Sequence, residues 1–83
     1  TVEQVEGSQD VGYMLALLKS GDSRVRCAAA DSLGNWAPNV EAGARATLRP
    51  AIAPLTKSLH DRKATVRSSA AVALGRVARR LRD

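Results

Sequence analysis

The chain has few of the residues that build large cores or reactive centres. Among its 83 residues there is no phenylalanine, and tyrosine, tryptophan, cysteine and histidine occur once each. A single cysteine excludes a disulfide framework and a cysteine-based metal site, and a single histidine without a second ligand at metal spacing argues against zinc. The sequence has no apolar run of about 18 residues that could cross a bilayer and no secretory signal segment. We therefore expect no metal, no cofactor, no membrane contact, and an intracellular, cytoplasmic location.

Alanine is the residue that the chain has in excess, at 15 of 83 positions. A chain of this length forms one small domain. Its apolar residues recur at spacings of three and four and never alternate in steps of two, and alanine disfavours sheets. The sequence therefore predicts an all-α domain over residues 10–83, preceded by a polar, flexible leader over residues 1–9.

Helix-capping and helix-breaking residues divide the domain into separate helices. Asp22 or Ser23 caps a helix whose end is marked by residues 34–39. Pro50 interrupts the region that follows, because a proline inside a helix removes a hydrogen bond and clashes with the preceding turn. The pattern predicts helices from near Ser8 or Asp10 to about 20, from 23 to the 34–39 region, over 41–49, from 50 or 51 to about 59, and from 64 nearly to the end.

The chain also matches itself when it is shifted by 41 residues. Seven of the 26 pairs between residues 11–36 and 52–77 are identical. A period of about 40 residues with two helices per copy is typical of a solenoid. We expect one repeat over about 10–37 and a second over about 39–82. The identical pairs are Leu18 and Leu59, Val25 and Val66, Arg26 and Arg67, Ala29 and Ala70, Ala30 and Ala71, Leu33 and Leu74, and Gly34 and Gly75.

The second copy resembles a HEAT repeat, in particular the short HEAT-like type named after phycobilisome lyases. The resemblance rests on Leu59-x-Asp61, four further residues, and then Val66-Arg67-x-x-Ala70-Ala71-x-x-Leu74-Gly75. The first copy departs from the pattern, because Ser20 stands where the pattern has aspartate. The resemblance implies an α-α superhelix (solenoid) of about two helical hairpins. It also implies structural roles for Arg26, Arg67 and Asp61 between stacked repeats, core positions for Val25, Val66, Leu33 and Leu74, and close helix contact or helix termination at Gly34 and Gly75, with contact favoured at Gly75.

Positive charge is concentrated in the second half of the chain. Residues 1–41 carry a formal charge of −3 and residues 42–83 carry +8, which together give +5. Such a surface fits an acidic protein partner or the phosphates of a nucleic acid, although a solvated helix face has the same pattern. No aromatic residue lies among the arginines, which argues against base stacking. The candidate contact residues are Arg62, Lys63, Arg76, Arg79, Arg80, Arg82, Arg45 and Arg49.

The sequence predicts a non-catalytic protein. Cys27 and His60 could form a nucleophile and base, but nothing in the sequence brings them together. The leading hypothesis is a helical-repeat scaffold for protein–protein interaction, as a segment of a larger solenoid or as a small self-associating module. One alternative is sequence-independent binding to a nucleic-acid backbone. A second is an accessory or bilin-lyase-type role, which the resemblance alone implies. Val72 points outward on the last helix, which indicates a homodimer partner, a further repeat, or simply an isolated exposed valine.

Overall fold

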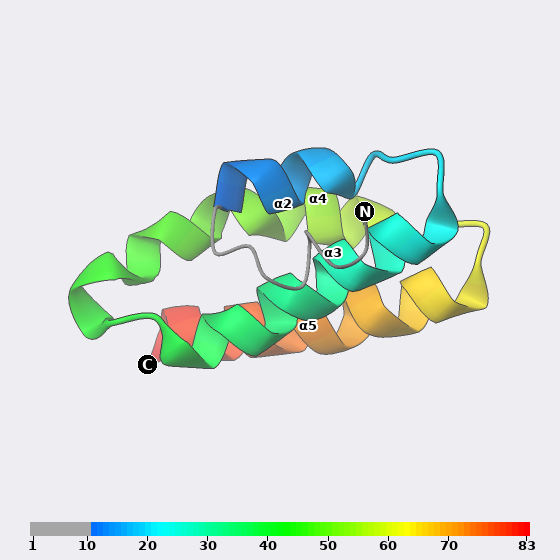
Figure 1. Ribbon diagram of the computed structural model, residues 1–83. Helices are drawn as coiled ribbons and strands as arrows, with labels where there is room; N and C mark the ends of the chain where they lie inside the picture. The colour runs from blue at the N-terminus through cyan, green and yellow to red at the C-terminus, as the bar shows by residue number, and fades with distance from the viewer. Residues whose placement is uncertain (1–10) are drawn as a thin grey trace.

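The described part of the chain, residues 11–83, consists of helical segments and contains no strand (Figure 1). The coordinates are a computed structural model. The all-α prediction is confirmed, whereas the predicted leader over residues 1–9 lies outside the described residues. The segments are α2 (Val11–Leu17), α3 (Ser23–Trp36), the short 3-10 helix η1 (Ala37–Asn39), the longer 3-10 helix η2 (Ala42–Ala51), α4 (Ile52–Ser58) and α5 (Ala64–Arg82).

Helix α3 begins where the sequence predicted. The Asp22 carboxylate accepts a hydrogen bond from the backbone N–H of Arg24 at 2.9 Å, which satisfies one of the free donors of the first turn. The helix ends later than Gly34, the first of the predicted helix-terminating residues. Gly34 is buried inside the helix, which ends at Trp36, two residues before Pro38. A helix tolerates this glycine because tertiary packing outweighs its low propensity.

The proline-containing region adopts a different helix type from the one predicted. The segment expected to form a short α-helix over 41–49 is the 3-10 helix η2, which contains Pro50. Helix α4 then begins at Ile52, so that Pro54 is its third residue. The first turn of a helix has N–H groups without partners in that helix, and proline is therefore tolerated there.

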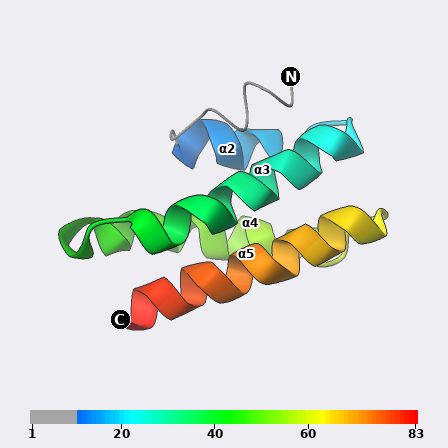
Figure 2. The same cartoon turned by 60° about the horizontal axis from the view of Figure 1, so that its bottom comes forward.

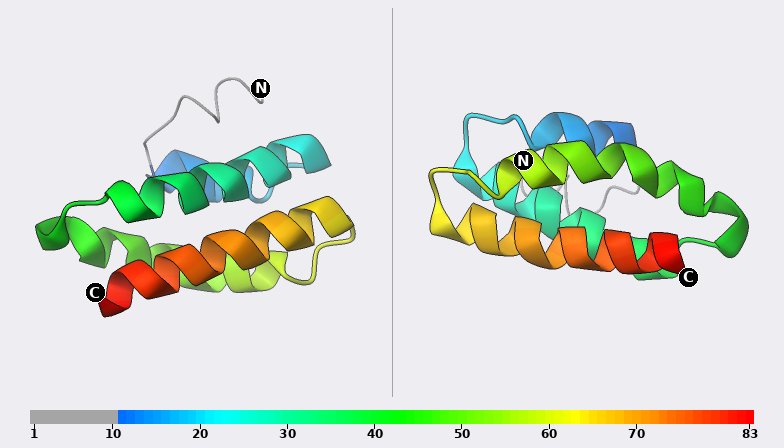
Figure 3. Two further views of the ribbon diagram at one scale, coloured as in Figure 1. Left: turned by 90° about the horizontal axis from the view of Figure 1, so that it is seen from below. Right: turned by 180° about the vertical axis from the view of Figure 1, so that it is seen from behind.

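The helices form two hairpins that lie side by side. Helix α2 packs on α3 in the first hairpin, and η2 with α4 packs on α5 in the second. Helices α3 and α5 run in the same direction next to each other in one layer (Figures 2 and 3), and in the second layer α2 lies behind α3 and α4 behind α5 (Figure 3). This arrangement is an α-α superhelix of two helical hairpins, as predicted. No helix within residues 11–83 has the length and apolar character needed to cross a membrane.

The core lies between the two layers and is built from a few aliphatic side chains with alanines between them. Alanine lets neighbouring helices approach closely. Val25 and Leu74, which were predicted as core residues, are only partly buried at the rim of this core. The fully buried large side chains are Met14, Leu33, Leu48, Leu55, Val66 and Val77.

Candidate functional site

An ion pair joins the two hairpins at one end of the α3–α5 interface. The Nε of Arg26 donates to Oδ2 of Asp61 at 2.7 Å, and its Nη2 donates to Oδ1 at 3.1 Å. Its third nitrogen, Nη1, donates to the backbone carbonyl of Ser20 at 2.8 Å. Both charged side chains are 11% exposed. This two-point pairing fixes the start of α3 relative to the turn before α5, and it also neutralises both charges.

The pair also shifts the proton affinity of its members. The side-chain hydrogen bond from Arg26 lowers the pKa of Asp61, and the backbone N–H of Lys63, at 2.9 Å, lowers it further. The same side-chain bond raises the pKa of Arg26. Both changes favour the charged forms, so the ion pair is intact at neutral pH.

Helices α3 and α5 meet through small residues. A Cβ added to Gly34 would lie only 3.0 Å from Cα of Ala73 and 3.2 Å from its Cβ. Nearby, Sγ of Cys27 lies 3.1 Å from Oγ of Ser69. Gly75 differs from its counterpart Gly34, because no atom of the described structure beyond its chain neighbours and the adjacent backbone of α5 lies within 4 Å of the Cβ it lacks. The expected helix contact at Gly75 is therefore not found within residues 11–83.

The thiol of Cys27 has structural neighbours on both helices. Besides Ser69, its contacts are the carbonyl of Thr65 at 3.8 Å and the carboxylate of Asp31 at 3.9 Å. His60 is exposed and lies in the turn after α4. The geometry of Cys27 is thus that of a small residue at a helix contact.

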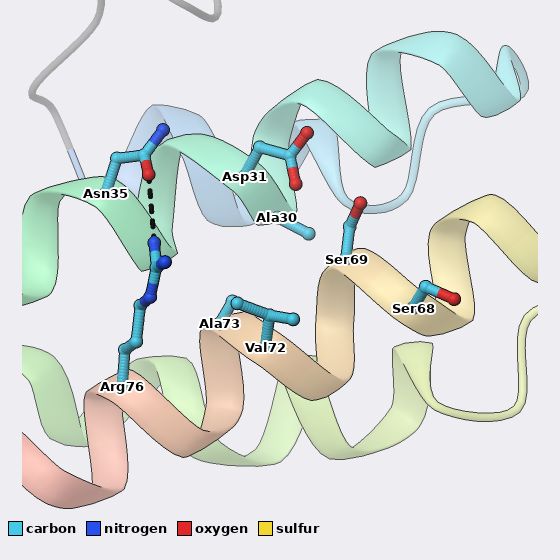
Figure 4. Close-up of a pocket in the computed structure, with 9 residues that line it drawn as sticks. Ala30, Asp31, Asn35, Ser68, Ser69, Val72, Ala73 and Arg76 are labelled. Atoms are coloured by element: carbon cyan, nitrogen blue, oxygen red, sulfur yellow. Dashed lines mark hydrogen bonds between the residues drawn. The ribbon is translucent and has the colours of Figure 1, made fainter.

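A groove runs between α3 and α5 on the side away from α2 and α4 (Figure 4). Its volume is about 360 Å³. Val72 stands on its rim with 54% of its surface exposed. Near one end, Nη1 of Arg76 donates to Oδ1 of Asn35 at 3.0 Å. The lining residues are Ala30, Asp31, Gly34, Asn35, Ser68, Ser69, Val72, Ala73 and Arg76.

The charges of this groove are unevenly distributed. Asp31 of α3 is exposed in its middle part, whereas Arg76 of α5 lies beside Asn35 (Figure 4). Arg79 and Arg82 follow Arg76 at three-residue intervals on the last turns of α5, and both are exposed. Residues three apart are neighbours on a helix surface, so these arginines form a row that extends from the groove.

Arg80 binds the protein's own backbone, whereas Arg76 of the same helix binds the side chain of Asn35. It is partly buried, and its Nε donates to the carbonyl of Val40 at 3.0 Å. Its Nη2 donates to the same carbonyl, and Asp83 lies 4.0 Å from its Nη1. Arg80 therefore attaches the end of α5 to the segment between η1 and η2.

The remaining candidate contacts fall into two separated groups. Arg45 and Arg49 belong to η2, where Nε of Arg45 donates to the carbonyl of Ala42 at 3.2 Å and Arg49 is exposed. Helix η2 lies at the end of the molecule that holds the C-terminus of α5 (Figure 1). Arg62 and Lys63 precede α5, at the opposite end of this 19-residue helix. Because a helix rises 1.5 Å per residue, roughly 28 Å separates the two ends, and the candidate contact residues therefore lie in two separate places.

Sequence reasoning overlooked several residues of the groove, among them Asn35, Ser69 and Asp31. The 41-residue repeat period could have identified two of them, Asn35 and Ser69. Asn35 and Arg76 are 41 positions apart, and Cys27 and Ser69 are 42 apart. In stacked repeats, residues separated by about one period lie next to each other, because the corresponding helices are neighbours.

The fold and these contacts define a class of protein, namely an all-α solenoid of stacked helical hairpins. The family model for the HEAT repeat matches residues 11–40, which comprise α2, α3 and η1, and this match supports the predicted resemblance to that family. The comparisons found no match among curated proteins and none among solved structures. HEAT repeats generally act as non-enzymatic scaffolds for protein interactions.

Proposed function

We propose that this chain is a non-catalytic scaffold that binds an acidic segment of a partner protein along the α3–α5 groove. The observation that carries the proposal is the groove itself, with an exposed valine on its rim and an arginine row at one end. Val72 offers apolar surface to a partner side chain. Arg76 and Arg79 offer positive charge to carboxylates.

The charges of the groove favour one orientation of the bound segment. A carboxylate near Asp31 would be repelled, whereas one near Arg76 would be attracted. We infer that acidic residues of the partner lie at the Arg76 end and that an apolar side chain lies over Val72. Complementary charge at such exposed positions contributes mainly to the association rate and to partner choice.

Two pairs of basic residues provide a matched test. Arg76→Gln with Arg79→Gln removes two charges next to the groove, and Arg62→Gln with Lys63→Gln removes two charges at the far end of α5. The probe is a fluorescein-labelled peptide rich in glutamate and leucine, followed by anisotropy. We expect the first double variant to weaken binding by roughly 2- to 30-fold, since each exposed ion pair contributes about 0.2–1 kcal/mol. The second double variant should bind like the unmodified chain, and equal losses in both would contradict the proposal.

Binding to the backbone of a nucleic acid is the second candidate, favoured by the exposed row of Arg76, Arg79 and Arg82. The same titration with a labelled random DNA duplex, at about 50 and 200 mM salt, distinguishes the two candidates. Phosphate contacts lose most of their strength over this range. Tight duplex binding that collapses at the higher salt, with no binding of the acidic peptide, would replace the protein-partner proposal.

The accessory or bilin-lyase-type role stays a prediction from the resemblance to that repeat type. An absorbance titration with a free bilin tests it, and an unchanged bilin spectrum would remove it. The repeat boundaries at about 10–37 and 39–82 and the cytoplasmic location also stay predictions.

A further inference from the structure

The groove between α3 and α5 carries one charge of each sign, and neither is paired within residues 11–83. Asp31 on α3 and Arg76 on α5 both line the groove (Figure 4), and both are exposed. No group of opposite charge in the described structure lies at ion-pair distance from either side chain. The thiol of Cys27, at 3.9 Å from the carboxylate of Asp31, supplies no positive charge. Two opposite charges are therefore available to a ligand of this groove.

The repeat places the two charges at successive levels of the groove. Asp31 and Val72 are 41 residues apart, as are Asn35 and Arg76, and a hydrogen bond of 3.0 Å joins the second pair. Residues one period apart lie beside each other in stacked hairpins. Asp31 therefore lies across the groove from Val72, and one helical turn further on Asn35 meets Arg76 (Figure 4). Four residues of helix rise about 6 Å, which separates the two levels along the groove.

Each level has its own chemistry. The amide of Asn35 orients Arg76 without neutralising it, and their hydrogen bond uses only Nη1 of the guanidinium. A guanidinium has five N–H donors, so the others can bind a carboxylate. At the other level, the half-exposed side chain of Val72 lies across from the carboxylate of Asp31. A lysine suits both of these groups, because its methylene stem covers apolar surface while its ammonium group reaches a charge.

We propose that the partner segment is a helix with a lysine over Asp31 and Val72 and a glutamate over Arg76, four residues apart. This inference rests on the proposed scaffold function and specifies the charge order of the partner. The lysine stem supplies the apolar contact with Val72, and Asp31 disfavours a segment that is acidic throughout.

The dimensions of the groove favour a helix over an extended segment. Side chains four apart share one face of a helix and are about 6 Å apart along its axis, which matches the two levels. A helix also satisfies its own backbone hydrogen bonds, whereas an extended segment needs partners for its free N–H and C=O groups. Two of the polar side chains in the groove already have partners, because Asn35 binds Arg76 and Ser69 contacts Cys27.

Anisotropy titrations of the full chain with three labelled peptides test the charge order. The peptides are versions of the glutamate- and leucine-rich peptide that carry lysine, leucine or glutamate at one position, four residues from a glutamate retained in all three. The set is made with this position before and after the retained glutamate, so that either orientation of the helix is covered. We expect the lysine peptide to bind most tightly and the glutamate peptide least. Each exposed attraction or repulsion changes affinity by roughly 1.4- to 5-fold, so the two peptides should differ by roughly 2- to 30-fold.

Substitutions of Asp31 provide the matching change on the protein. Asp31→Asn should remove the preference for lysine over leucine, and Asp31→Lys should make the glutamate peptide the tightest ligand. Glu41→Gln is the control, because Glu41 is an exposed acid outside the groove that makes no side-chain cap to η2. It should keep the full preference. Circular dichroism checks that each variant retains its helices.

The outcomes separate this inference from the proposed function on which it rests. Equal affinity for the lysine and leucine peptides, or a lysine preference that survives Asp31→Asn, would overturn the charge order and leave the scaffold proposal standing. Failure of every peptide to bind would contradict both. A further peptide places the lysine and the glutamate two residues apart, where they share a face only in an extended segment. Tighter binding of that peptide would overturn the helix and indicate an extended partner.

Discussion

The two equivalent glycines of α3 and α5 give a prediction in which one substitution has opposite effects. Replacing either glycine by alanine improves helix propensity by about 1 kcal/mol. At Gly75 nothing within residues 11–83 opposes the gain, because beyond the adjacent backbone of α5 no atom lies within 4 Å of the new Cβ. At Gly34 the new Cβ would lie 3.0 Å from Cα of Ala73, well inside the usual carbon contact distance of about 3.5–4.0 Å. Moving the helices apart to relieve this contact costs about 1–3 kcal/mol.

The net effect of each substitution is the gain in helix propensity minus the cost of relieving the close contact. We expect Gly75→Ala to stabilise the chain by about 1 kcal/mol and Gly34→Ala to destabilise it by about 0–2 kcal/mol. For a domain of this size, each kcal/mol shifts the melting temperature by about 4–8 °C. Urea denaturation and thermal melts of the two variants, followed by circular dichroism at 222 nm, measure the difference directly. If Gly34→Ala is as stable as Gly75→Ala, the close packing of α3 on α5 is refuted.

Two further predictions concern the core and the inter-hairpin ion pair. Leu33→Ala should lower the free energy of unfolding by about 2–5 kcal/mol, because Leu33 is fully buried. Leu74→Ala should lower it by about half as much, because Leu74 is only partly buried. Equal shifts of the urea midpoint in the two variants would contradict the assignment of Leu33 to the core. Because the folded pKa of Asp61 lies below its unfolded value of about 3.9, its stabilising contribution is complete above about pH 4–5 and is lost as the pH falls through the folded pKa. Asp61→Asn should flatten the acid limb of stability against pH between about 2 and 6, and an unchanged limb would show that the ion pair does not stabilise the fold.

The sequence predicted those local features of the fold that depend on a single residue or on the helical spacing of apolar residues. Asp22 caps α3 because its short carboxylate reaches the first free N–H groups. Val66 and Leu33 are buried because the helical spacing of apolar residues places them on the inner face. The sequence also predicted a proline-dependent break near residue 50. It did not predict the 3-10 geometry of η2, since propensity distinguishes poorly between two helix types with the same residues.

The remaining differences arise from neighbours that a single helix does not reveal. Leu33 and Leu74 occupy equivalent positions, yet only Leu33 is fully buried. Gly34 and Gly75 differ in the same way. In each pair the first residue has the second hairpin beside it, and the second residue has no equivalent cover within residues 11–83. The partners of Arg80 and Asn35 required knowledge of which helices stack, which the 41-residue period could have supplied.

The most direct test of the account is a map of where an acidic partner binds. Amide NMR spectra of the isotope-labelled chain, recorded during titration with the glutamate- and leucine-rich peptide, locate the perturbed residues. We predict shifts concentrated at Asn35, Val72 and Arg76, with little change at Arg62 and Lys63. Shifts centred on the turn before α5, or no shifts at peptide concentrations that saturate the anisotropy signal, would contradict the α3–α5 groove as the binding site.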